Sequence, residues 1–143
     1  MRSVVLGMSR CLFELILAIK RKCLCNEEQI EVDLGLSAAE FHGLMALDNG
    51  QGMLGGQFAE RMGLSPSRGS RVLNKLVTDG LVQVESRATD RRSILVSLTP
   101  KGARMKDRIT EQMRDCEQRI CGRLDSTHVD RVKGVLEWLE AAL

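Results

Sequence analysis

The chain has few of the residue types on which catalysis usually depends. Its 143 residues include only two histidines, His42 and His128, and no tyrosine. Neither histidine stands in a nucleophile–base arrangement. The glycines at 50–52 and 55–56 lack the lysine and the strand-then-helix setting of a phosphate-binding loop. The sequence therefore argues against an enzyme, and we expect no catalytic residues.

Long apolar runs are also missing. The most apolar N-terminal stretch, residues 11–19, contains Glu14, leads into Lys-Arg-Lys and lacks a small-residue cleavage site. We therefore expect no membrane contact and a cytoplasmic protein. A hydrophobic content of 43% and a charged content of 28% are ordinary for a globular chain. Wholesale disorder is excluded, and the length suffices for one core.

Charge is small in total but uneven along the chain. The formal net charge is +2, yet only three acidic residues lie between positions 61 and 106, and the remainder of the chain is net acidic. This distribution predicts a positive patch on the middle third and an anionic partner. The basic residues of this segment are Arg61, Arg68, Arg71, Lys75, Arg87, Arg91, Arg92, Lys101, Arg104 and Lys106.

Apolar residues recur at helical spacing at both ends of the chain. One stripe covers roughly residues 3–25 and is followed by a polar, glycine-containing linker at 26–36. A second stripe of about 25 residues starts after Thr99-Pro100, and Ser126-Thr127 is expected to cap a last helix. Such broad apolar faces do not stay in water, so we expect these helices to pack on one another or on a second copy.

The middle of the chain predicts a helix-turn-helix. A capping box formed by Ser37 and Glu40 opens a helix that we expect to end near Asn49-Gly50. A short helix at 56–62 follows. The next helix, 65–80, has a good N-cap in Ser65, a proline in its first turn and a terminating glycine. Two short helices joined by a glycine-containing turn are typical of this motif.

A small β-sheet is expected beside these helices. Residues 81–85 and 94–98 alternate apolar and polar side chains, which predicts two hairpin strands around a polar loop. Residues 53–54 are a candidate third strand. The loop between the hairpin strands is rich in arginine, so a basic hairpin lies next to a basic helix.

The helix 65–80 and the hairpin loop together carry the chemistry for gripping duplex DNA. Arg68 and Arg71 lie one turn apart, and an arginine there can contact guanine in the major groove, worth roughly 1–3 kcal/mol of discrimination. Loop arginines suit a narrow minor groove, with Asp90 holding one of them. The expected DNA contacts are Ser65, Ser67, Arg68, Ser70, Arg71, Asn74 and Lys75 from the helix, and Arg87, Asp90, Arg91 and Arg92 from the loop.

Five short stretches resemble the MarR family of winged-helix transcription regulators. They are Leu36-Ser37, the helix from Ser65 to Leu76, Gly80-Leu81-Val82, Asp90-Arg91-Arg92 and Leu98-Thr99-Pro100-Lys101-Gly102. The last two form the most specific signature, and the resemblance extends over essentially the whole chain.

The resemblance implies a mainly α (α+β) fold. Residues 1–36 and 100–143 would form a helical dimerisation platform, and residues 37–99 a winged-helix DNA-binding lobe. It also implies a homodimer on a pseudo-palindromic operator, acting as a repressor, with Arg92 as the wing arginine and Asp90 as its buttress. Gly69 stands where a β-branched residue is usual, and a mid-helix glycine costs roughly 0.5–1 kcal/mol, so we expect a softer recognition helix.

Three interpretations are possible for the signal to which such a regulator responds. The resemblance implies a small phenolic or anionic effector in a pocket between platform and lobe. Thiol oxidation is the second: Cys11 is placed like the reactive cysteine of the hydroperoxide-sensing branch, and Cys23 and Cys25 lie beside three basic residues. Five cysteines, an odd number, argue against a closed set of disulfides, so we expect reduced thiols, with Cys116 packed in the core.

Metal binding is the third interpretation, and the weakest one. His42 resembles a zinc ligand of zinc-responsive members of the family, and Cys23, Cys25 and Glu27 could lie nearby. Cys-x-Cys is a poor spacing for zinc, so a metal cofactor is not expected. A winged helix used only for protein–protein contact is a further alternative. The retained basic residues, such as Arg68 and Arg71, favour double-stranded DNA as the partner.

Overall fold

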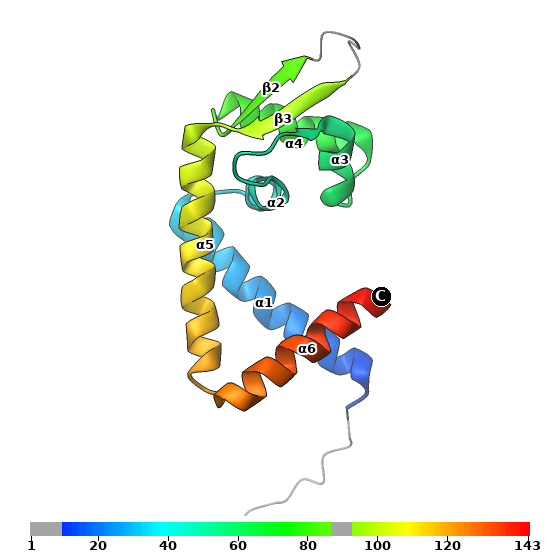
Figure 1. The fold of residues 1–143 in the computed structure, drawn as a ribbon, viewed down its shortest axis with the longest axis vertical. Coiled ribbons are helices and arrows are strands. Elements are labelled where there is room, and N and C mark those ends of the chain that lie inside the picture. Colours follow the sequence, from blue (N-terminus) through cyan, green and yellow to red (C-terminus); the bar gives the residue numbers. More distant parts are fainter. Residues whose placement is uncertain (1–9, 87–92) are drawn as a thin grey trace, which may run out of the picture.

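The molecule consists of a compact lobe and an open arrangement of long helices, joined by one helix that belongs to both. The computed structural model describes residues 10–86 and 93–143. Figure 1 shows the lobe at one end, with α2, α3, α4 and the sheet, while α5 runs from the lobe to α1 and α6 at the other end. The fold is mainly helical with a small antiparallel sheet, as the sequence predicts.

Helix α1 spans Leu12–Leu34, so the linker expected at 26–36 is wrong. Glutamate and glutamine at 27–29 are good helix formers, and the apolar stripe continues through Ile30 into the core. The helix ends at Gly35, whose φ of +67° is a left-handed cap. The part of the expected helix before residue 10 lies outside the described residues.

Helix α2, Ala38–Ala46, begins at the expected capping box. The Ser37 backbone N–H donates to Glu40 Oε2 at 2.7 Å, and the Glu40 N–H donates to Ser37 Oγ at 3.2 Å. The helix ends before the expected Asn49-Gly50, because Leu47 leaves it in an extended conformation (φ −98°, ψ 136°) and is fully buried. The burial of Leu47 in the core therefore ends the helix before Gly50, the glycine at which the sequence predicts the end.

The helix-turn-helix consists of α3 (Gly55–Arg61) and α4 (Pro66–Thr78). These helices cross very closely at Gly69. A β-carbon on Gly69 would come 2.5 Å from Ala59 Cβ, which is far inside van der Waals contact. The glycine that departs from the usual family pattern is therefore required by the packing of this particular pair of helices.

The sheet has the order β1-β3-β2, and all its pairs are antiparallel. Strand β1 is Met53–Leu54, β2 is Val82–Ser86 and β3 is Ile94–Leu98. Val82 opposes Leu98, and Met53 opposes Val96. Val82 and Val96 point into the core, so the hairpin is fastened to the lobe at its base.

Helix α5, Pro100–Cys121, starts on a tightly bonded turn. Thr99 Oγ1 accepts from the Gly102 N–H at 3.0 Å and donates to the Gly80 carbonyl at 2.6 Å. The start of α5 is thereby tied to Gly80, the glycine that follows the end of α4. Helix α6, Ser126–Ala142, is capped by Asp125 rather than by the expected Ser126-Thr127, since the Asp125 carboxylate accepts from the His128 N–H at 2.9 Å.

The core lies almost entirely in and under the lobe. Its fully buried side chains come from α2, α3, α4, the sheet and the upper part of α5, with one from the turn after α2: Leu44, Leu47, Phe58, Leu76, Val82, Val96 and Ile109. Helix α6, by contrast, contains no buried residue. A search of the described helices finds none with the length and apolarity needed to cross a bilayer.

Candidate nucleic-acid interface

Helix α4 has one face in the core and one face in solvent. Gly69, Leu73 and Leu76 are buried, at the spacing of a single helical face. The opposite face exposes the side chains that the sequence predicts as DNA contacts: Ser67, Arg68, Ser70, Arg71, Asn74 and Lys75. The core therefore fixes the direction in which these side chains point.

The start of α4 is ordered by its own serines. Ser65 Oγ accepts from the Arg68 N–H at 3.4 Å and lies 3.4 Å from Ser67 Oγ. Ser70 Oγ donates to the Pro66 carbonyl at 2.9 Å, which holds its hydroxyl against the helix backbone. The remaining N–H groups of the first turn, with the helix dipole, suit a phosphate.

The two arginines of α4 differ from its lysine in their partners. Lys75 Nζ lies 2.7 Å from Asp79 Oδ2 and 3.6 Å from Glu40 Oε1. The pKa of Lys75 is raised, chiefly by the hydrogen bond to Asp79. The pKa of Asp79 is lowered, first by a hydrogen bond with Glu40 and then by the one from Lys75. Within the described chain, neither Arg68 nor Arg71 has an ion-pair partner, so their charges are available.

Some basic residues of the middle third serve the fold instead. Arg61 Nη1 donates to the Ala46 carbonyl at 3.0 Å and lies 3.2 Å from Asp48 Oδ2. Lys101 Nζ donates to the Asp79 carbonyl at 2.7 Å, and Lys106 Nζ donates to the Leu47 carbonyl. Counting the basic residues in the sequence overestimates the positive patch on the middle third, because the count includes side chains that are bound to backbone carbonyls.

The hairpin stands on the same lobe as α4. Strands β2 and β3 lead away from the core beside that helix (Figure 1). The expected loop contacts, Arg87, Asp90, Arg91 and Arg92, lie outside the described residues, so the structure says nothing of their positions.

This combination of helix-turn-helix, hairpin and long flanking helices is matched in known proteins. The family model described as "MarR family" matches residues 34–93. A solved MarR-family regulator from Silicibacter pomeroyi is 29% identical, with a TM-score of 0.72 over 90% of this chain and 87% of that one. The chain is thus similar to MarR-family regulators, with the family model matching its middle segment. A comparison with curated protein sequences gives no match.

Two further solved structures share the fold. One is Bordetella bronchiseptica BpsR, 21% identical with a TM-score of 0.73 over 89% of this chain and 96% of that one; its DNA binding is described as regulated by 6-hydroxynicotinic acid. The other is a mutant of Staphylococcus aureus MepR bound to an oligodeoxyribonucleotide, 18% identical with a TM-score of 0.64 over 93% and 98% of the two chains.

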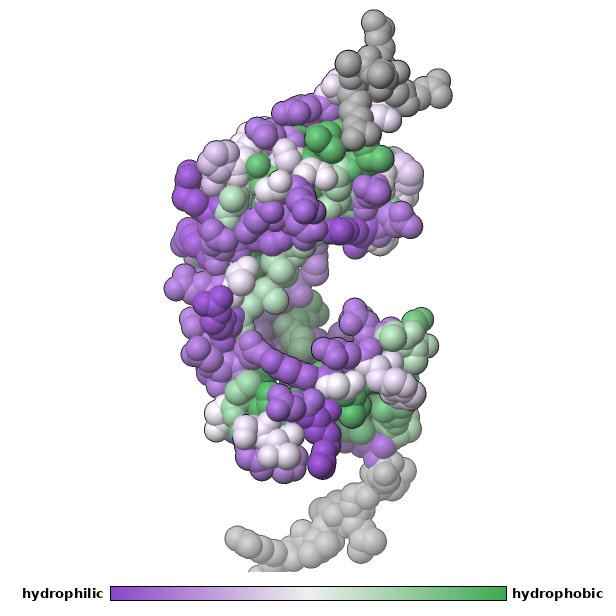
Figure 2. All heavy atoms as spheres, in the orientation of Figure 1, coloured by the Kyte–Doolittle hydropathy of each residue, from purple (hydrophilic) through white to green (hydrophobic). Residues whose placement is uncertain are grey.

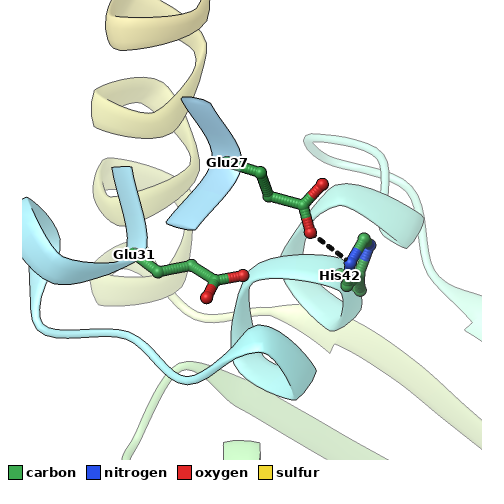
Figure 3. A group of neighbouring side chains, drawn as sticks. All are labelled: Glu27, Glu31 and His42. Atoms are coloured by element: carbon green, nitrogen blue, oxygen red, sulfur yellow. Dashed lines mark ion pairs between the residues drawn. The ribbon is translucent and has the colours of Figure 1, made fainter. Parts of the chain in front are cut away.

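A second cluster of polar side chains joins α1 to α2. His42 Nε2 lies 2.6 Å from Glu27 Oε1, and Glu31 reaches the same space from the next turn of α1 (Figure 3). One ligand atom from each of the three residues lies within 4.8 Å of the others. The pKa of Glu31 is raised, chiefly by desolvation and then by the charge of Glu27.

Of the candidate metal ligands that the sequence suggests, the structure brings only His42 into this cluster. His42 belongs to the cluster, but Cys23 and Cys25 do not. Because α1 stays helical beyond residue 26, Glu27 and Glu31 share the face that meets α2, while Cys23 lies a turn earlier and Cys25 on another face. Glu31 is not among the metal ligands suggested by the sequence, because residues 26–36 were expected to form a linker.

The cysteines divide into two groups by exposure. Cys11, Cys23 and Cys25 are exposed, whereas Cys116 and Cys121 are half-buried, and all five are free thiols. Cys116 packs against the hydrophobic core, which confirms its expected place. The redox role of Cys11, Cys23 and Cys25 stays a prediction.

Proposed function

We propose that this chain is a DNA-binding transcription regulator that binds a pseudo-palindromic operator as a homodimer. The observation that carries the proposal is the pair Arg68 and Arg71, exposed on a helix whose other face is anchored in the core and, among the described residues, without ion-pair partners. Free guanidinium groups on a rigid, protruding helix suit the major groove. A protein–protein module would not need them.

The roles of the interface residues follow from their places on α4. Arg68 and Arg71 contact base edges, with Asn74 one turn further along. Ser65 and Ser67 lie at the helix start and bind backbone phosphate, together with the N–H groups of the first turn, and Ser70 does so when its hydroxyl turns from the Pro66 carbonyl to the phosphate. Lys75, held by two carboxylates, contributes a weaker phosphate contact. The loop residues Arg87, Arg91 and Arg92 enter the minor groove, with Asp90 orienting them.

A second copy of the chain is the partner that completes the fold. Apolar side chains of α1 and α6 are exposed in one chain, with Trp138 at 71% and Phe13 at 66%. Figure 2 shows hydrophobic surface at this end of the molecule. A helix with no buried residue gains little from its own chain, so a partner must cover it. We name as the dimer face Leu12, Phe13, Ile19, Val135, Trp138 and Leu143.

DNA binding is tested by fluorescence anisotropy with a labelled duplex taken from the region upstream of the chain's own gene. Affinity should fall steeply with salt, because each neutralised phosphate releases a counterion. An unrelated duplex of equal length is the control and should bind more weakly at every salt concentration. Equal affinity for both duplexes, or affinity without salt dependence, would remove sequence-specific regulation.

The regulator responds to a signal, and the candidates are a small effector, thiol oxidation and a divalent cation. BpsR, of the same fold, is described as regulated by 6-hydroxynicotinic acid, which favours a small anionic effector that releases a repressor from DNA. Oxidation of the exposed thiols Cys11, Cys23 and Cys25 stays an alternative route to the same release.

A divalent cation is a third candidate signal, favoured by the cluster of Glu27, Glu31 and His42. Two carboxylates and an imidazole are suitable ligands for zinc, and the cluster joins a platform helix to the lobe. Isothermal titration of the metal-free protein with Zn²⁺ tests it. We expect one site per chain that His42→Ala removes and that the exposed control His128→Ala leaves intact; unchanged binding in His42→Ala would reject the site.

A further inference from the structure

The turn after α2 contains the only asparagine–glycine step of the sequence. The chain has three asparagines, Asn26, Asn49 and Asn74, and glycine follows only the second of them. Asn49 and Gly50 are both exposed, and Gly50 has a φ of +77°. Because glycine has no β-carbon, its backbone nitrogen is open to the side chain of the residue before it. The amide carbon of Asn49 therefore has a nucleophilic nitrogen within reach along the chain.

The backbone nitrogen of Gly50 is not engaged in the fold. Within the part of the chain that the structure describes, its N–H group donates to no other backbone group. The nitrogens that follow the other two asparagines belong to Glu27 in α1 and Lys75 in α4, where the N–H groups take part in the helical bonding pattern. Among the three asparagines, an exposed side chain and a free following nitrogen thus coincide at Asn49.

The step Asp79-Gly80 has the same kind of sequence but a different structure. Gly80 is exposed as well and also has a positive φ, of +71°. Its N–H group, however, donates to the Val77 carbonyl at 3.0 Å, and the Asp79 carboxylate accepts from Lys75 Nζ at 2.7 Å. Both groups that would have to react are held at the end of α4. The sequence does not separate the two glycine steps, whereas the structure does.

Side chains from α3 and α5 hold the turn that contains Asn49. Arg61 pairs with the aspartate before Asn49, at 3.2 Å, and Lys106 Nζ donates to the Leu47 carbonyl. Asn49 Nδ2 itself donates to Asp107 Oδ1 of α5 at 3.5 Å. Both of these cations therefore already have partners, and the contact of Asn49 with α5 requires its side chain to be a donor.

We propose that Asn49 is a site of spontaneous deamidation and that the product weakens the contact between this turn and α5. The Gly50 nitrogen attacks the side-chain carbonyl carbon of Asn49. A carbon–nitrogen bond forms and closes a five-membered succinimide, and the side-chain nitrogen leaves as ammonia with the proton of the Gly50 N–H. Water then opens the ring at either carbonyl and gives aspartate or isoaspartate. The sequence of steps is balanced with water as its one added reactant.

The product replaces a hydrogen-bond donor by a carboxylate. A negative charge at position 49 faces Asp107, so that attraction becomes repulsion. Isoaspartate in addition lengthens the backbone of the turn by one carbon atom. Since Lys106 and Arg61 are engaged elsewhere, neither neutralises the new charge without giving up a bond that now holds the turn. The lobe therefore loses part of its attachment to α5.

Peptide mass spectrometry of the aged, full-length protein tests the site. Samples kept warm in mildly alkaline buffer are compared with unaged samples digested in parallel, and isoaspartate is confirmed with isoaspartyl methyltransferase. Asn49 should convert faster than Asn26 and Asn74 by about tenfold or more, which corresponds to about 1.4 kcal/mol in activation free energy. Asp79 should stay free of isoaspartate. Equal conversion of the three asparagines, an unmodified Asn49, or as much isoaspartate at Asp79 would overturn the proposal.

Substitutions test the consequence for stability, and neither experiment involves DNA. Asn49→Asp should raise the equilibrium constant for unfolding about two- to fivefold, the effect of an exposed charge pair, as followed by urea denaturation. Adding Asp107→Asn should recover most of the loss, because one amide and one carboxylate face each other again. Asp115→Asn, an exposed aspartate elsewhere on α5, is the matched control and should recover nothing. An Asn49→Asp variant as stable as the unmodified chain, or equal recovery by both second substitutions, would remove the proposed effect on α5.

Discussion

Gly102 is packed directly on the backbone of Leu81. A β-carbon on the glycine would overlap the Leu81 carbonyl oxygen, and no rotamer change relieves a clash with backbone. Leu81 follows the end of α4, and Gly102 lies in the first turn of α5. With the hydrogen bonds of Thr99, this contact fixes the end of α4 against the helix that leads to the platform.

Gly102→Ala should therefore be strongly destabilising. Because the obstacle is backbone, the two segments must separate, and we expect a loss of at least about 2 kcal/mol in the free energy of unfolding. Urea denaturation followed by circular dichroism measures it. Gly134→Ala on α6 is the matched control, since a β-carbon there meets nothing within 4 Å. Equal stability of the two variants would contradict the packing described here.

The contact between Gly69 and Ala59 can be tested by one substitution that disrupts it and a second substitution that compensates for the first. Gly69→Ala should lower stability by about 1–3 kcal/mol, because its β-carbon would lie 2.5 Å from that of Ala59. Adding Ala59→Gly removes the opposing methyl group and should recover a large part of the loss in a double-mutant cycle. Additive losses in the double variant would show that the two residues do not share one contact.

Arg71→Ala should weaken specific DNA binding more than non-specific binding. Loss of a bidentate contact to guanine costs roughly 1–3 kcal/mol, whereas a lost phosphate contact weakens all sequences alike. Anisotropy titrations with the operator and with an unrelated duplex give the two values. Arg114→Ala, an exposed arginine on α5, is the control and should change neither. Equal loss on both duplexes would assign Arg71 to the phosphate backbone.

Trp138→Lys should convert the dimer into a monomer. The indole is 71% exposed in one chain, and a lysine would place a charge inside the proposed dimer face. Sedimentation velocity at several concentrations measures the association state. Val77→Lys, a similar change on the lobe, should leave the dimer intact. A Trp138→Lys variant that sediments as a stable dimer would move the interface elsewhere.

Three helix starts could be predicted from sequence because their signals are local. Ser37 with Glu40, Ser65 with Pro66, and Thr99 with Pro100 each act within one turn, and all three begin helices in the structure. Helix ends depended on distant packing: α2 stops where Leu47 enters the core, and α1 continues because Ile30 and Leu34 are buried by the lobe.

The candidate sites also include some features that local sequence patterns predict and others that only the tertiary structure shows. The exposed face of α4 follows from helical periodicity, so Arg68 and Arg71 were placed correctly on it. The cluster around His42 needs the meeting of α1 with α2, which no local pattern encodes, and Glu31 was hidden in a segment read as a linker. Likewise, only tertiary structure shows that Arg61 is bound to a carbonyl.

Helix α1 is one unbroken rod of 23 residues, about 34 Å long. Its first turns carry part of the proposed dimer face, and its last turns, through Ile30 and Leu34, lie in the core of the lobe. If two copies associate through this face, a change in the angle between their α1 helices would move the two α4 helices apart or together. The half-site spacing that fits the dimer would then be set by the angle at which two copies cross, many ångströms from any base pair.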